Sequence, residues 1–184
     1  MADIGRRALI AGVGGSLAVG VAPALAAKPS SLLGKPAPPF EVTTFSHQKI
    51  SSANLAGKVV VLNYWATWCT PCKAEMIVME DYMRHHHGTD LQIFAIATED
   101  SVSDYQLRPL AKVLSFPLIS VLHGRGYGLI KGEVPTSYVI DRAGVVRHAD
   151  SGAFETRSFD ELVTPLLAEA APAPSPAMAP TAAS

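Results

Sequence analysis

Cysteine is scarce in this chain of 184 residues, which contains only Cys69 and Cys72. A zinc site of the structural type needs a second ligand pair, and no other cysteine exists to supply it. A structural disulfide between these two residues would close a very short loop and would stabilise little in the chain-entropy model. The two cysteines therefore point to redox chemistry rather than to a metal site or a stapled scaffold.

An excess of charge of either sign is also absent. The chain has 15 Lys and Arg residues against 16 Asp and Glu residues, which gives a net charge of −1. This balance gives no reason to expect a nucleic acid or an anionic membrane surface as a partner. No internal repeat is visible either.

The first 26 residues are predicted to be an export signal. Arg6-Arg7 precedes an apolar, glycine-rich run that ends at Pro23, and Ala24-Leu25-Ala26 offers small residues for cleavage. The arginine pair only partly resembles a twin-arginine signal. A retained anchor in the inner membrane is the alternative, since Ala8–Ala27 is about long enough to span a bilayer. Both interpretations take the protein out of the cytoplasm, to a bacterial periplasm.

Behind the signal we expect a linker at 27–32, a single domain at 33–169 and a tail at 170–184. The tail consists of Ala, Pro and Ser with one Met and one Thr, a composition that cannot bury a core. We predict that it is a disordered spacer.

Strand and helix patterns alternate along the domain. Val59–Tyr64 is almost wholly apolar and rich in β-branched residues, as expected of a strand buried on both faces. The other predicted strands are at 40–43, 91–97 and 116–121, with a hairpin at 136–148. Two further helices are predicted, one capped by Ser101 or Ser103 and kinked or interrupted at Pro109, and a last one from Phe159 to Leu167 kinked at Pro165. This order predicts a mixed sheet between helical layers.

A helix is also predicted directly after the cysteines. One stripe of this helix, which we expect to be core rather than a copper site, contains Cys72, Met76, Met79 and Met83. It ends near His85-His86-His87, interpreted as a solvated helix end whose charge suits the dipole. Cys69 can sit at the exposed N-terminus of this helix, where unpaired N–H groups stabilise a thiolate.

At this point the chain resembles the TlpA/ResA-like family of exported thiol–disulfide oxidoreductases, which have the thioredoxin fold. The resemblance covers nearly all of 33–167. It rests on Gly34-Lys35-Pro36-Ala37-Pro38-Pro39-Phe40, Leu55-Ala56-Gly57-Lys58, Asn63-Tyr64-Trp65-Ala66-Thr67-Trp68-Cys69-Thr70-Pro71-Cys72, and Val134-Pro135-Thr136 before Ile140-Asp141. It implies an α/β thioredoxin fold, with a mixed central β-sheet flanked by helices and an N-terminal extension of the TlpA/ResA type.

The resemblance also implies which residues act. Cys69 and Cys72 would be the catalytic pair, and Pro135 matches a cis-proline opposite them in the fold. The substrate would contact Trp68, Thr70, Pro71, Val134, Pro135 and Thr136. A proline offers no N–H and a cis bond fixes a tight backbone geometry, so Val134 can present its backbone to a substrate strand.

Two further positions separate this subgroup from cytoplasmic thioredoxins. Asn63 occupies the place of a buried aspartate in thioredoxins, and an amide cannot take the proton that Cys72 must lose. Glu75 lies one helical turn beyond Cys72 and matches a glutamate of ResA-like proteins. A partly buried carboxylate there would have a raised pKa and could exchange protons with Cys72. The alternative is a surface glutamate paired with Lys73.

The predicted function is reduction of protein disulfides in the periplasm, such as those of apocytochrome c or metallochaperones. A membrane thiol-transfer protein would donate electrons, and no cofactor beyond the Cys69–Cys72 disulfide is expected in a monomeric enzyme. Three alternatives stay open: an oxidant or isomerase, a copper module using both cysteines and a residue such as His123, and a thiol peroxidase. The sequence motif differs from the copper carriers and peroxidases of this fold, while the direction of electron flow depends on redox poise.

Overall fold

The computed structural model describes residues 32–86, 88, 90–99 and 101–172, with the side chain of Asp104 excepted. The predicted export signal, His87 and the tail beyond residue 172 lie outside the described residues. The described elements are β1 (Phe40–Thr44), β2 (Lys49–Ser51), the 3-10 helix η1 (Ser52–Leu55), β3 (Val59–Trp65), α1 (Thr70–His85), β4 (Leu91–Ala97), α2 (Asp104–Val113), β5 (Leu118–Gly124), β6 (Thr136–Ile140), β7 (Val146–Ser151) and α3 (Thr156–Ala168).

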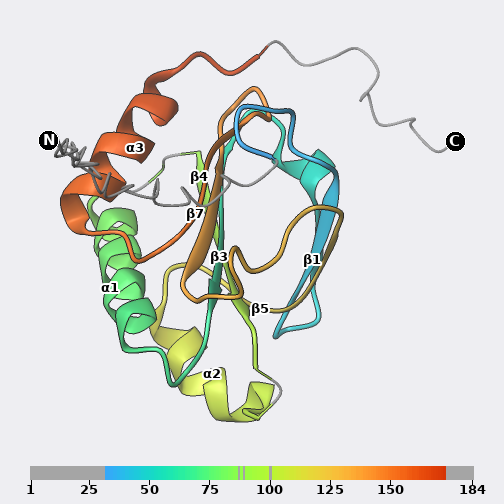
Figure 1. The fold of residues 1–184 in the computed structure, drawn as a ribbon, viewed down its shortest axis with the longest axis vertical. Helices are drawn as coiled ribbons and strands as arrows, with labels where there is room; N and C mark the ends of the chain where they lie inside the picture. Colours follow the sequence, from blue (N-terminus) through green and yellow to red (C-terminus); the bar gives the residue numbers. More distant parts are fainter. Residues whose placement is uncertain (1–31, 87, 89, 100, 173–184) are drawn as a thin grey trace, which may run out of the picture.

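One mixed sheet organises these elements, in the order β2-β1-β5-β4-β3-β6-β7 (Figure 1). Strands β3, β4 and β5 are parallel, and the remaining pairs are antiparallel. Every residue of β3 is buried, which confirms the prediction from its apolar run. The predicted fold class, a mixed sheet flanked by helices, is confirmed.

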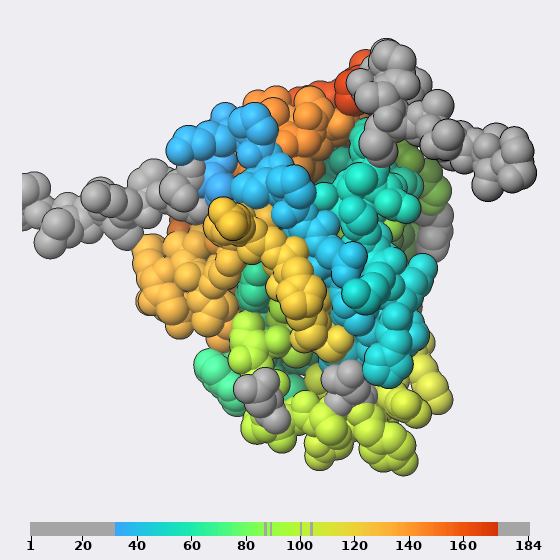
Figure 2. All heavy atoms as spheres, turned by 90° about the vertical axis from the view of Figure 1, so that its right-hand side faces the viewer, coloured from blue at the N-terminus to red at the C-terminus, as the bar shows by residue number. Residues whose placement is uncertain are grey.

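The two faces of the sheet are covered differently. All three α-helices pack on the face that contains Val61, Trp65 and Ile93. The opposite cluster, around Leu62 and Phe94, draws its buried residues from strands, η1 and the chain before β1. Figure 2 views this second side, where the segment before β1 and the chain after β5 lie over the sheet. The expectation of helical layers on both faces is therefore wrong, because irregular segments supply enough apolar side chains to cover one face.

Helix α1 follows the sequence pattern closely. Cys72, Met76 and Met79 are at most 4% exposed, and Met83 packs against the same core, so the methionine stripe is core as predicted. The helix ends at His85, which is largely exposed and whose Nδ1–H donates a hydrogen bond to the Asp81 carbonyl at 2.8 Å. Pro71 fits the first turn, where a missing N–H costs no helical hydrogen bond.

Other predicted elements shift at their ends or were missed. Ser103 is the N-cap of α2, and its backbone N–H donates a hydrogen bond to the Gln106 side-chain oxygen at 3.0 Å. Helix α2 continues past Pro109, so the helix is not interrupted there, and α3 likewise contains Pro165 within its length. Strand β2 was not predicted, because its three residues are too few for a periodic pattern.

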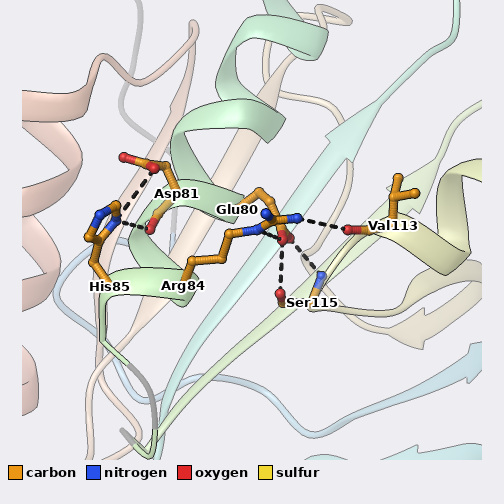
Figure 3. A network of polar contacts seen from close by, with 6 residues as sticks. All are labelled: Glu80, Asp81, Arg84, His85, Val113 and Ser115. Carbon is orange, nitrogen blue, oxygen red and sulfur yellow. Dashed lines mark hydrogen bonds and ion pairs between the residues drawn. The ribbon is translucent and has the colours of Figure 1, made fainter.

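A carboxylate fixes the spacing between α1 and the chain that follows α2 (Figure 3). Glu80 accepts hydrogen bonds from the Ser115 N–H at 2.6 Å and the Ser115 hydroxyl at 2.9 Å, and it pairs with Arg84. Burial alone would raise the pKa of Glu80, but these donors outweigh it and lower that pKa. The ionised carboxylate is therefore the form that holds the two segments together.

We expect Glu80→Ala to lower the free energy of unfolding by about 1–3 kcal/mol, since the Ser115 N–H loses its acceptor. Because the folded-state pKa of Glu80 is lowered, this stabilisation is fully present above the ordinary glutamate pKa. It is lost as the pH falls from that value through the lowered folded-state pKa. Urea unfolding at neutral and acidic pH measures both effects. Glu161→Ala, which removes an exposed ion pair with Arg157, is the control and should change stability by less than about 0.5 kcal/mol. Equal losses in both variants would contradict a special role for Glu80.

A shorter chain should keep the fold. We expect a fragment of residues 27–169 to unfold cooperatively and to exchange thiols, because every described helix and strand lies within it. Circular dichroism during urea unfolding tests this boundary. A broad transition without a baseline would show that the removed segments belong to the folded unit.

Candidate active site

The two cysteines form a disulfide across the first turn of α1. Cys69 is the N-cap residue, and its Sγ accepts a hydrogen bond from the Cys72 N–H at 3.2 Å. This confirms that Cys69 sits at the helix N-terminus. In the reduced protein the same N–H and the helix dipole favour a thiolate at Cys69, whereas Cys72 lies inside the helix without these donors.

Cys69 is less accessible than the sequence suggested. It is 3% exposed and Cys72 is fully buried, so the expectation of an exposed Cys69 is wrong for this disulfide form. The Cys69 Sγ lies 3.7 Å from the Val134 carbonyl oxygen, and the half-buried Val134 packs on the core cluster that contains both cysteines. The segment before β6 therefore covers the sulfur from the side.

The peptide bond between Val134 and Pro135 is cis, as expected from the sequence. Trp68, Thr70 and Pro71 are exposed around Cys69, with Trp68 70% exposed, so a docking partner can reach all three. Thr136 differs: it is fully buried, its hydroxyl donates to the Glu133 carbonyl at 2.7 Å, and it accepts the Ile130 N–H. Its side chain holds the preceding loop and cannot contact a substrate in this form.

Glu75 is fully buried, more deeply than the predicted partial burial, and it is not a surface residue paired with Lys73. Its Oε2 accepts a hydrogen bond from Asn63 Nδ2 at 2.8 Å. Its Oε1 accepts the Phe154 N–H at 3.2 Å and the Ser137 hydroxyl at 3.4 Å. Burial raises the pKa of Glu75 from its ordinary value of 4.5 to about 7, although these three donors act in the opposite direction.

Asn63 links the carboxyl group to the sheet. Its amide nitrogen donates to both Glu75 and Ser137, while Oδ1 is buried and has no hydrogen-bond partner among the described residues. An amide carries a donor and an acceptor, so a turn of the side chain would offer Oδ1 to a protonated Glu75. Asn63 can therefore serve both protonation states of its neighbour, which an aspartate could not do.

Sequence reasoning found Asn63 and Glu75 but missed Ser137 and Phe154. Thr136 and Ser137 are polar residues that precede Tyr138-Val139-Ile140 in β6, and this change within one strand is the signal that could have revealed Ser137. Phe154 contributes only its backbone N–H, for which no side-chain pattern exists. No hydrogen bond joins Glu75 to Cys72 in the described part of the chain, so proton exchange between them needs a rearrangement or a bridging water.

Neither a metal centre nor a membrane-spanning helix is found among the residues that the structure describes. No group of three or more His, Cys, Asp and Glu side chains there is arranged to hold a metal ion. His123, the histidine considered for copper, lies in β5 opposite Glu41 of β1. None of the described helices is long and apolar enough to cross a membrane.

Comparison with known proteins decides the family. The profile described as "AhpC/TSA family" matches residues 33–149. The chain belongs to this thioredoxin-like family. Among similar proteins is "Thioredoxin-like protein YneN" of Bacillus subtilis (strain 168), 32% identical over 131 residues that cover 70% of this chain and 76% of that protein.

A second relative is "Thiol-disulfide oxidoreductase ResA" of Bacillus thuringiensis (strain Al Hakam), 36% identical over 122 residues. That match covers 62% of this chain and 66% of ResA, slightly less than two thirds of its length. Among solved structures, a putative protein disulfide isomerase from Bacteroides thetaiotaomicron has a TM-score of 0.63 at 24% identity, covering 74% of this chain and 91% of the other. The predicted TlpA/ResA-like membership is confirmed by the relatives, and the fold by the structure.

Proposed function

We propose that this protein is a thiol–disulfide oxidoreductase that reduces disulfides in partner proteins. The observation that carries the proposal is the Cys69–Cys72 disulfide at the N-terminus of α1, with a single backbone donor directed at Cys69. The name of the relative ResA supports the same reaction class. A helix N-terminus that activates one of two adjacent thiols is the arrangement that dithiol exchange requires.

The reaction uses two electrons from the reduced pair. The Cys69 thiolate attacks one sulfur of the partner disulfide, so that a mixed disulfide forms and the other partner sulfur leaves as a thiolate that takes up a proton. The Cys72 thiol then loses its proton and attacks Cys69 Sγ. The second partner sulfur leaves as a thiol, and the Cys69–Cys72 disulfide seen in the structure is the product.

Glu75 is proposed to manage the proton of Cys72. A carboxyl group with a pKa of about 7 is divided between both protonation states near neutral pH, which suits a group that accepts and returns a proton. Its contacts with Asn63, Ser137 and Phe154 hold the carboxyl group one turn beyond Cys72. Trp68, Thr70, Pro71 and the Val134 backbone form the proposed partner contact around Cys69.

The proposed setting is the bacterial periplasm, reached through the N-terminal signal or from an anchor in the inner membrane. Apocytochrome c or metallochaperone cysteines are the proposed substrates, and a membrane thiol-transfer protein is the proposed electron donor. The disulfide itself is the redox group, and the protein is proposed to act as a monomer.

The reduction potential of the Cys69–Cys72 pair decides the direction of electron flow. We expect a value near that of thioredoxin, roughly −270 mV, measured by equilibration with glutathione buffers and separation of the two forms by thiol alkylation. A value near roughly −120 mV would make the protein an oxidant and would contradict the reducing role. Cys69→Ser should show no such equilibrium, which confirms that the signal comes from this pair.

A further inference from the structure

A groove of about 560 Å³ lies between α1 and α2, and its lining includes neither the disulfide nor the Glu75 cluster nor Val134. Trp65, Met76 and Leu107, all at most 7% exposed, contribute to its lining. The other side of α1 is covered by α3, where Tyr82 packs against Phe159. The volume falls in the range of sites that bind small molecules or anchoring side chains.

Two aliphatic residues flank the groove and are left in solvent. Ile77 of α1 is 71% exposed, and Val113 of α2 is 61% exposed. Polar contacts join α1 to the end of α2 at this side: Arg84 Nη2 donates to the Val113 carbonyl at 3.5 Å, and Glu80 binds Ser115 (Figure 3). The groove therefore has polar contacts between its two walls at one side and, at its rim, apolar residues that no part of the described chain covers.

The groove extends to the active site. Thr67 and Lys73 belong to its lining, and they flank the segment that carries the two cysteines. Thr67 is two residues from Cys69, so their Cα atoms are within about 8 Å of each other. An extended partner chain rises about 3.3 Å per residue, so a side chain two or three positions from its cysteine reaches this end.

We propose that the groove binds an aliphatic side chain, leucine in size, that lies two or three positions from the target cysteine of the protein substrate, with an acidic residue beside it. This inference deepens the proposed function and rests on it. The aliphatic side chain is inferred from the apolar lining, and the exposed Trp68 adds apolar surface next to Cys69 in the sequence. The acidic residue of the substrate is inferred from Lys73, a cation with no ion-pair partner within 4.0 Å among the described residues. The Glu99 carboxylate interacts with Lys73 electrostatically from a longer distance.

A substrate with an apolar side chain that fits such a pocket commonly has a kcat/KM about tenfold higher, or more, than a substrate without that side chain. The exposed positions of Ile77 and Val113 also make the groove testable without harm to the core. Substitution of either residue by serine removes apolar surface at the rim, and neither contacts the disulfide or the Glu75 cluster.

The test uses the full-length protein in its reduced form and symmetric disulfides of short peptides. Each peptide has one cysteine and one glutamate, and carries either leucine or serine two or three positions before or after the cysteine. We expect at least one leucine position to raise kcat/KM about tenfold over serine. The double variant Ile77→Ser/Val113→Ser should reduce that ratio to about one, while oxidised glutathione, which has no aliphatic side chain, reacts at the original rate.

The matched control is Val121→Ser, which removes an aliphatic residue that is 42% exposed in β5, outside the groove lining, and should leave the leucine preference intact. Equal rates for all leucine and serine peptides, with glutathione still reduced, would overturn the groove assignment while leaving the proposed function in place. No reaction with any disulfide would overturn the proposed function itself. Concentration-dependent dimers that Ile77→Ser/Val113→Ser abolishes, without a peptide preference, would assign the groove to a second copy of the chain.

Discussion

Cys69→Ser should abolish exchange with protein disulfides, and Cys72→Ser should accumulate mixed disulfides through Cys69. The asymmetry arises at the helix N-terminus. The Cys72 N–H donates to Cys69 Sγ, so only Cys69 gains a donor and the helix dipole for its thiolate. Without Cys72 the mixed disulfide cannot be resolved within the protein, and the intermediate persists.

Mass spectrometry after mixing with a disulfide-containing protein measures the trapped species, and a thiol-release assay measures turnover. Serine is a good N-cap residue, so Cys69→Ser should retain the start of α1 and a cooperative unfolding transition. A folded Cys69→Ser protein without turnover therefore reports chemistry rather than stability. Mixed disulfides that accumulate in Cys69→Ser, through Cys72, would reverse the assignment of the two roles.

Structural features that depend on residues close together in the sequence were predictable. The apolar run Val59–Tyr64, the Cys69–Cys72 spacing and the methionine stripe each depend on positions within one strand or a few helical turns. The N-cap position of Cys69 follows from the same local pattern. These elements place the site because a strand that ends at Trp65 must turn into α1 directly before the cysteines.

Features that depend on distant segments were not predictable. The burial of Cys69 results from Val134, 65 residues away, and the Glu75 cluster depends on the Phe154 backbone, 79 residues away. The groove between α1 and α2 depends on how Glu80 and Ser115 set the distance between two helices. No periodicity within a single segment contains that information.

Glu75 lies at the meeting point of these distant segments, and its titration has a measurable consequence for stability. Its folded-state pKa of about 7 is higher than the ordinary 4.5, so the folded protein holds this proton more tightly than the unfolded chain. Stability therefore falls as the pH rises from about 4.5 to about 7. At a pH above both pKa values, the loss of stability caused by this pKa shift is on the order of 3 kcal/mol.

Glu75→Gln should remove this pH dependence, because glutamine stays neutral. Its oxygen can take the place of Oε1, which accepts from Phe154 and Ser137, and its NH2 group can donate to Asn63 Oδ1 once that amide has turned. In the oxidised protein the cysteines do not titrate, so urea unfolding between pH 4 and pH 8 reports the carboxyl group. Subtraction of the two curves cancels histidines common to both proteins. The variant should become more stable than the wild type as the pH rises, by on the order of 3 kcal/mol at the upper end.

The same substitution should slow the resolution of the mixed disulfide, by on the order of 10²-fold if Glu75 takes the proton of Cys72. Stopped-flow measurement of partner release across pH 5–9 should show an inflection near pH 7 in the wild type that Glu75→Gln lacks. Glu161→Gln, at an exposed position of α3, is the control and should follow the wild type in both experiments. A stability difference without a change in resolution would make Glu75 a buried structural acid, and the proton of Cys72 would then leave to water or to another group.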